Sequence, residues 1–103
     1  MKSPNACLVF VFPASMEENV VDHFSKPSAS IHGFTLSHVE GYSARRGFHS
    51  LAEQIHGRGP RVHVQLLVDR ADVAEIIARL KAEGPTRDVA YWVMPVDEFG
   101  TLD

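Results

Sequence analysis

EGYSARRGFHSLAEQIHGRGPRVHVQLLV, residues 40–68, sets the architecture of this chain. Residues 40–42 end one predicted strand, a segment rich in glycine, arginine and histidine follows, and residues 61–68 form another strand. In this later strand the even positions are apolar and the odd positions mostly polar, which is typical of a strand with one face in the core. We therefore expect a hairpin in the middle of the chain, with a long loop at its tip.

A strand and a helix are predicted before this hairpin. ACLVFVF, residues 6–12, is a continuous apolar run that fits a strand buried on both faces. Ser15 and Glu18 have the spacing of a capping box, which predicts a helix that starts there and ends at Pro27. Alternation over residues 31–42 then predicts the first strand of the hairpin.

A second helix and a last strand are predicted after the hairpin. Asp69 is the expected N-cap of a helix whose apolar residues recur with helical spacing and which ends at Gly84. Residues 89–96 form the last strand. The order β-α-β-β-α-β predicts one α+β domain over residues 1–103. Its fold is ferredoxin-like, a four-stranded antiparallel sheet with two helices on one face.

The other face of this sheet is predicted to be too apolar to face water. It carries Val9 or Phe10, Leu67, and Trp92 or Met94. Apolar patches of this kind mark protein contacts, so we expect this face to be buried between subunits of a homo-oligomer.

Composition excludes several classes of protein. A net charge of −3 argues against a nucleic-acid binder, and the one cysteine, Cys7, rules out an internal disulfide. Since no segment approaches transmembrane length, we expect no membrane insertion and a cytoplasmic location. The residues contain no nucleophile–base pair, paired carboxylates or cofactor fingerprint, so we do not expect an enzyme.

EGYSARRGFHSLAEQ (40–54) and RVHVQLLVDRADVAEIIARL (61–80) resemble the PII-like superfamily, which includes nitrogen regulatory PII and CutA-like proteins. Gly41 and Tyr42 match the glycine and aromatic residue that close the second strand in PII proteins. Arg46 and Gly47 match the residues that open the flexible T-loop, here about residues 43–60. The resemblance implies a homotrimer whose sheets face one another. It also implies that a small effector binds between subunits at the loop base.

SLAEQIHGR (50–58) and YWVMPV (91–96) resemble, more narrowly, a branch of this superfamily of unknown function whose members accompany heavy-metal and cation efflux systems. This implies a metal effector and a partner protein in transport. The chain departs from PII proteins proper in three ways: there is no tyrosine between Gly47 and Pro60, GPTRDVAYW (84–92) replaces a glycine-rich phosphate turn, and the end of the chain is acidic instead of basic. An adenine nucleotide stays open as an alternative effector.

Six histidines suggest candidate metal ligands, although His23, on the first helix, and His32, at a strand start, are expected on the surface. On one continuous helix His49, Glu53 and His56 would share a face, and two imidazoles with a carboxylate suit zinc, copper, nickel or cobalt. Alternatively, Ser50 and Glu53 form a capping box and the segment is a solvated loop helix without metal. His38 and His63 lie on strands expected to pair near the loop base; they form either a second metal site or hydrogen bonds at a subunit interface.

The arginines suggest an anion site, because guanidinium groups pair with phosphate and carboxylate. Alternatively, they keep the loop soluble or pair with Glu40 and Glu53. Trp92 either stacks on the ligand or packs in the core. The expected ligand contacts are Gly41, Arg45, Arg46, Gly47, Arg58, Arg61, Arg87 and Trp92.

Three functions remain open at this point. The first is a trimeric PII-like sensor whose loop orders when the effector binds and then docks on a partner. The second is a metal-binding buffer or chaperone without signalling output. The third is a structural interaction module that binds no small ligand.

Overall fold

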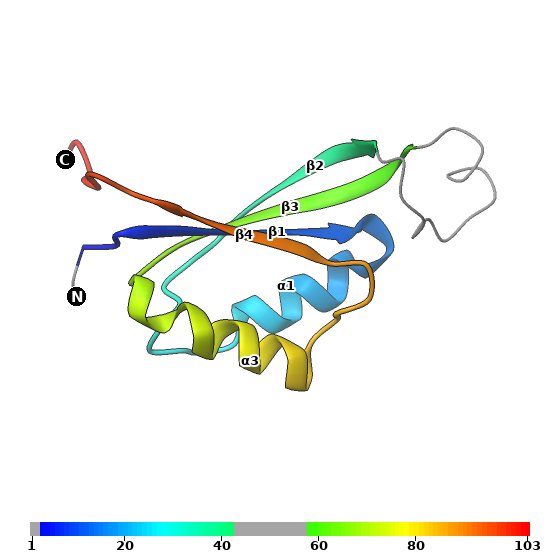
Figure 1. Cartoon of the computed structure of the whole chain (residues 1–103), viewed down its shortest axis with the longest axis horizontal. Helices are drawn as coiled ribbons and strands as arrows, with labels where there is room; N and C mark the ends of the chain where they lie inside the picture. The colour runs from blue at the N-terminus through cyan, green and yellow to red at the C-terminus, as the bar shows by residue number, and fades with distance from the viewer. Residues whose placement is uncertain (1–2, 43–57) are drawn as a thin grey trace.

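The computed structural model describes residues 3–42 and 58–103, the side chain of Arg58 excepted. Among these residues the chain forms the predicted βαββαβ order, with a 3-10 turn ahead of each helix (Figure 1). The elements are β1 (Ala6–Pro13), η1 (Ala14–Met16), α1 (Glu17–Ser25), β2 (Thr35–Tyr42), β3 (Arg58–Val68), η2 (Arg70–Asp72), α3 (Val73–Glu83) and β4 (Ala90–Pro95).

The four strands form one antiparallel sheet in the order β2-β3-β1-β4. The two apolar strands, β1 and β3, therefore lie in the middle, and the more polar β2 lies at an edge. α1 and α3 lie side by side against one face of the sheet (Figure 1). The predicted α+β, ferredoxin-like fold is confirmed.

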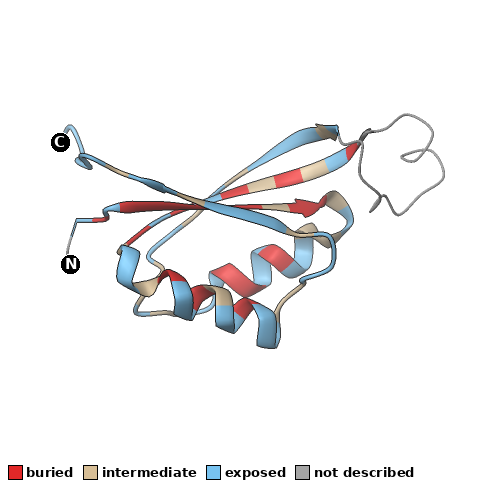
Figure 2. Ribbon diagram, in the orientation of Figure 1, coloured by how far each residue is buried: buried red, intermediate tan, exposed pale blue. Residues whose placement is uncertain are grey.

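The core lies between this face and the two helices. Paired residues of neighbouring strands face the same side, and Phe10 pairs with both Val64 and Tyr91 on the helix side. The Phe10 ring also lies 5.6 Å from the ring of Phe24 on α1. Figure 2 shows the buried residues along β1 and on the sides of the helices that meet it. The buried apolar cluster comprises Ala6, Leu8, Phe10, Phe12, Val20, Phe24, Val62, Val64, Leu66, Val68, Val73, Ile76 and Leu80.

The two helices begin differently from one another. Ser15 does not cap α1, so the predicted capping box is wrong: the chain leaves Pro13 through the η1 turn, and Ser15 lies inside that turn. Asp69 caps the η2 turn ahead of α3 and not α3 itself: its carboxylate accepts a hydrogen bond of 3.0 Å from the backbone N–H of Ala71, whereas the N-cap of α3 is Asp72, which makes no side-chain cap bond. α3 ends at Gly84 as predicted; the Gly84 N–H donates to the Leu80 carbonyl at 2.8 Å.

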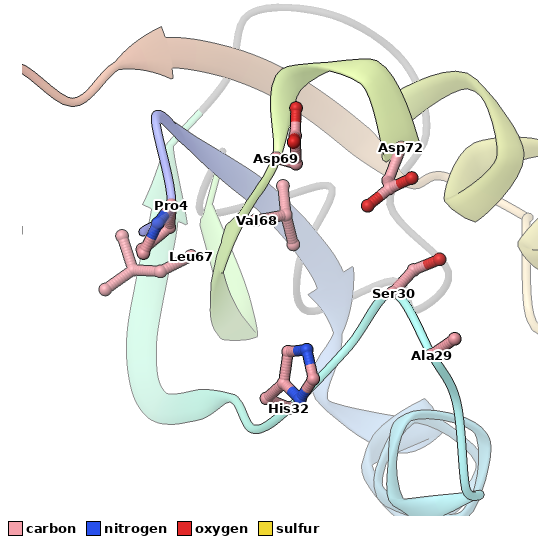
Figure 3. Close-up of a pocket in the computed structure, with 8 residues that line it drawn as sticks. All are labelled: Pro4, Ala29, Ser30, His32, Leu67, Val68, Asp69 and Asp72. Atoms are coloured by element: carbon pink, nitrogen blue, oxygen red, sulfur yellow. The ribbon is translucent and has the colours of Figure 1, made fainter. Parts of the chain in front are cut away.

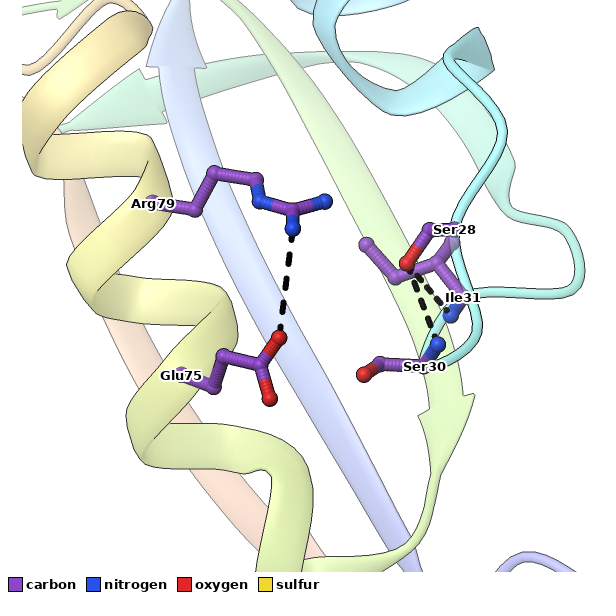
Figure 4. Close-up of polar contacts among 5 residues, drawn as sticks. All are labelled: Ser28, Ser30, Ile31, Glu75 and Arg79. Carbon is purple, nitrogen blue, oxygen red and sulfur yellow. Dashed lines mark hydrogen bonds and ion pairs between the residues drawn. The ribbon is translucent and has the colours of Figure 1, made fainter.

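The first hairpin strand starts later than alternation predicted, at Thr35 instead of Ile31. The hydroxyl of Ser28 accepts hydrogen bonds from the backbone N–H groups of Ser30 and Ile31, at 3.1 and 3.3 Å (Figure 4). These local bonds stabilise a turn in place of an extended chain. None of the helices in the described residues has the length and apolar content needed to span a membrane.

Candidate functional site

The face of the sheet opposite the helices, here called the open face, is largely apolar. Val9 lies at its centre and is fully buried, while Leu67, Trp92 and Met94 around it are 41%, 42% and 42% exposed. The register joins them, because Val9 pairs with Trp92 and Cys7 pairs with both Leu67 and Met94. The open face includes the apolar residues Cys7, Val9, Val11, Val39, Leu67, Trp92 and Met94.

Polar residues border this apolar surface on the side of β2 and β3. Ser37 pairs with His63, and Thr35 pairs with the exposed Gln65. The His63 ring lies 6.2 Å from the ring of Trp92. An apolar centre with a polar border is the composition of a protein contact surface.

The base of the hairpin loop places Arg61 against Gly41. Gly41 pairs with Gly59, and a side-chain carbon built at position 41 would lie 3.0 Å from Arg61 Cγ. The Arg61 guanidinium donates from Nη1 to the Pro60 carbonyl at 3.0 Å. The glycine at position 41 thus leaves room for the aliphatic stem of Arg61 to cross β2.

The other two described ligand candidates lie on β4 and on the turn before it. Arg87 is exposed in the α3–β4 turn, beside Asp88, whose φ is +57°. Trp92 lies on the open face, outside the helix-side core. Along β1, Arg61, His63 and Trp92 lie opposite Pro13, Val11 and Val9 respectively.

His38 and His63 lie on opposite faces of the sheet, so the two imidazoles do not meet within one chain. His63 shares the open face with its partner Ser37, while His38 pairs with the core residue Val62. The His38 ring is exposed and its Nε2 donates to Glu17 Oε1 at 2.6 Å, which links β2 to the start of α1.

The remaining candidates lie outside the described residues. Within the described residues, no three His, Cys, Asp or Glu side chains are arranged to hold a metal ion. The candidates that are not described are Arg45, Arg46, Gly47, His49, Glu53, His56 and the side chain of Arg58.

Among the hollows in the described residues, two lie beside the ends of the helices, away from the loop base. One, of about 290 Å³, lies between the α1–β2 connection and the end of β3; the His32 imidazole and the carboxylates of Asp69 and Asp72 border it (Figure 3). Asp69 is already engaged as the cap of η2. The other, of about 340 Å³, lies between the C-terminal ends of α1 and α3 and is bordered by His23 and Glu83.

A family model described as a protein of unknown function (DUF3240) matches residues 2–103. The chain belongs to the DUF3240 family. Its fold is similar to the crystal structure, at 2.40 Å, of a DUF3240 family protein from Shewanella baltica OS155. The two are 20% identical, with a TM-score of 0.77, over 99% of this chain and 100% of that one.

A second solved structure, a Bacillus cereus protein related to NIF3, is 17% identical with a TM-score of 0.62. The match covers 95% of this DUF3240 chain but only 27% of the Bacillus protein. No protein of curated function is similar to the chain. At these identities the likeness establishes the fold; the predicted link to metal efflux stays a prediction.

One residue of this DUF3240 chain was misjudged from sequence. His23, expected on the surface, is only 8% exposed, and its Nδ1 atom is buried with no hydrogen-bond partner in the described residues. Its burial could have been predicted from the sequence, because residues 20, 23 and 24 have the spacing of a helical apolar stripe. A histidine within such a stripe faces the neighbouring helix.

Proposed function

We propose that this DUF3240 protein is a small homotrimeric regulatory protein of the PII-like kind. It assembles through the open face and binds a small effector, a metal ion or an anionic metabolite or nucleotide, in the cleft between subunits at the loop base. Effector binding changes its contact with a partner protein, for which a metal efflux system is the candidate. It acts as a binding protein and not as an enzyme.

The open face is the observation that carries this proposal. A single chain leaves the apolar surface of Leu67, Trp92 and Met94 in water, and burying such surface stabilises an assembly by about 25 cal/mol per Å². The face is on the side of the sheet away from the helices, so copies of the chain can approach it without displacing the core (Figure 2).

The loop base supports the choice of effector. Arg61 and the α3–β4 turn that carries Arg87 lie at the end of the sheet that is remote from both termini (Figure 1). A guanidinium group suits a phosphate or carboxylate ligand. On assembly, arginines at the edge of the open face become shared between neighbouring subunits, which is where the effector of a PII-like protein binds.

A thermal-shift panel on the metal-free protein tests the proposal, with zinc, copper, nickel, cobalt, ATP, ADP and bicarbonate as probes. A probe at about a hundred times its dissociation constant adds about 2.7 kcal/mol to the free energy of unfolding. If the effector is anionic, Arg61→Ala reduces the shift, whereas Lys81→Ala, an exposed change on α3, leaves it unchanged.

The outcomes separate the candidate functions. A shift accompanied by a change in protease sensitivity supports the regulator. A metal-induced shift without such a change supports the buffer or chaperone. The absence of a shift with every probe contradicts effector binding, and the structural interaction module is then the remaining candidate function.

A further inference from the structure

The C-terminal ends of α1 and α3 meet at His23, whose imidazole is packed directly against Gly84. A side-chain carbon built on Gly84 would lie 3.3 Å from His23 Nδ1 and 2.5 Å from Leu80 Cδ1. His23 Nδ1 is buried without a hydrogen-bond partner in the described residues. The centroids of the His23 and Phe24 rings lie 5.0 Å apart with the ring planes at 82°, and the Phe24 ring carries no nitrogen or oxygen acceptor.

Burial, together with the surrounding charges, opposes protonation of this imidazole. Burial lowers the pKa of His23, and the neighbouring Lys26 ammonium lowers it further. The Glu83 carboxylate on α3 acts in the other direction, while the Arg79 guanidinium again lowers the pKa. Arg79 also forms an ion pair with Glu75 on the same helix, with 3.9 Å between the guanidinium nitrogen and the carboxylate oxygen (Figure 4). Asp22 borders the adjoining hollow.

We propose that His23 is a proton-sensitive lock on the α3–β4 turn. When the imidazole is neutral, Gly84 can pack closely against it. A protonated imidazole carries a charged N–H at Nδ1 that needs an acceptor, and a buried unpaired charge is too costly to keep. Glu83 is the acidic group on α3 that attracts this charge, so the end of α3 and Gly84 shift to let its carboxylate or water reach the ring.

The consequence falls on the end of the sheet where the effector is proposed to bind. Residues 84–89 form the turn from α3 to β4, and they carry Arg87. Moving Gly84 moves this turn. The link from the lock to effector affinity rests on the proposed function, but the lock itself does not.

The test is a pH titration from 7.5 to 5.0, monitored by NMR, on the protein without any effector. We expect the His23 imidazole to titrate with a midpoint below about 6.5, the unperturbed value. The backbone amides of Gly84, Arg87 and Asp88 shift with the same midpoint. In His23→Gln this step in the turn amides disappears; in His32→Gln, which alters an exposed imidazole, it persists.

Two results overturn the proposal. One is a His23 midpoint at or above about 6.5, which the wild-type protein alone reveals even if His23→Gln fails to fold. The other is that the chemical shifts of the turn amides do not change with pH in the wild type, or change in the same way in His23→Gln. Because no effector is present in this titration, these results do not contradict the proposed function. Conversely, a thermal-shift panel in which no probe stabilises the protein does not contradict the lock.

Discussion

The aliphatic stem of Arg61 crosses β2 at Gly41, so closely that a side-chain carbon at position 41 would lie 3.0 Å from Arg61 Cγ. Gly41→Val therefore displaces the arginine. We expect a change of less than about 1.5 kcal/mol in unfolding free energy, the scale of a strained rotamer. If the effector is an anion, the variant loses most of the thermal shift that ATP or bicarbonate gives the wild type.

Gly33→Val is the matched control for this change, since a side-chain carbon at Gly33 would meet no atom within 4 Å. It should keep both stability and the anion response. An anion response in Gly41→Val equal to that of the wild type would show that the position of Arg61 is unimportant for binding.

Gly84 tolerates a side chain much less well than Gly41. In Gly84→Ala the new carbon lies 2.5 Å from Leu80 Cδ1 and 3.2 Å from the Leu80 carbonyl, and Leu80 is buried in the core. Overpacking of this kind costs about 1–3 kcal/mol. Urea denaturation measures the loss, with Gly33→Ala as a neutral reference; equal midpoints for the two variants would contradict the packing described here.

Stability should fall on mild acidification because of His23. The unfolded chain binds a proton at this imidazole near pH 6.5. The folded chain, in which burial lowers the pKa of His23, binds it only at lower pH. Unfolding free energy is therefore lost as the pH falls through about 6.5 toward the folded-state pKa, at no more than about 1.4 kcal/mol per pH unit for one proton.

Urea titrations at several pH values measure this slope. His23→Gln should flatten it and His32→Gln should not. If stability instead rose on acidification and His23→Gln removed that rise, the folded state would favour the protonated ring, contrary to this prediction.

The contact between His38 and Glu17 should contribute little to stability. The two side chains are 68% and 40% exposed, and exposed ion pairs are worth about 0–1 kcal/mol. A double-mutant cycle of His38→Ala and Glu17→Ala should give a coupling free energy within that range, which decreases at high salt. A larger, salt-independent coupling would indicate a role that the exposed geometry does not explain.

Periodicity was sufficient to predict the topology. Alternation in β3 and the apolar stripe of α3 act within a few residues of sequence, and both are present in the structure. Asp69 also caps a turn, but the turn is η2 and not α3 as predicted. The same parity already implied that His38 and His63 face opposite sides, since His38 follows Leu36 by two residues and His63 lies between core valines.

Other features depend on contacts that spacing does not contain. The η1 turn after Pro13 moved the start of α1 past Ser15, and the Ser28 turn delayed β2. The burial of His23 follows from its place in the apolar stripe of α1, but its contact with Gly84 needs α3 beside α1. The loop candidates His49, Glu53 and His56 lie outside the described residues, so the metal site stays a prediction.

The molar mass in solution, measured by size-exclusion chromatography with light scattering at micromolar concentration, tests assembly through the open face most directly. The wild type should have three times the 11.4 kDa mass of one chain. Trp92→Lys should be a folded single chain, while Val21→Lys, an exposed apolar change on α1, should stay trimeric. A wild type of single-chain mass, or a trimer that Trp92→Lys leaves intact, would contradict the account.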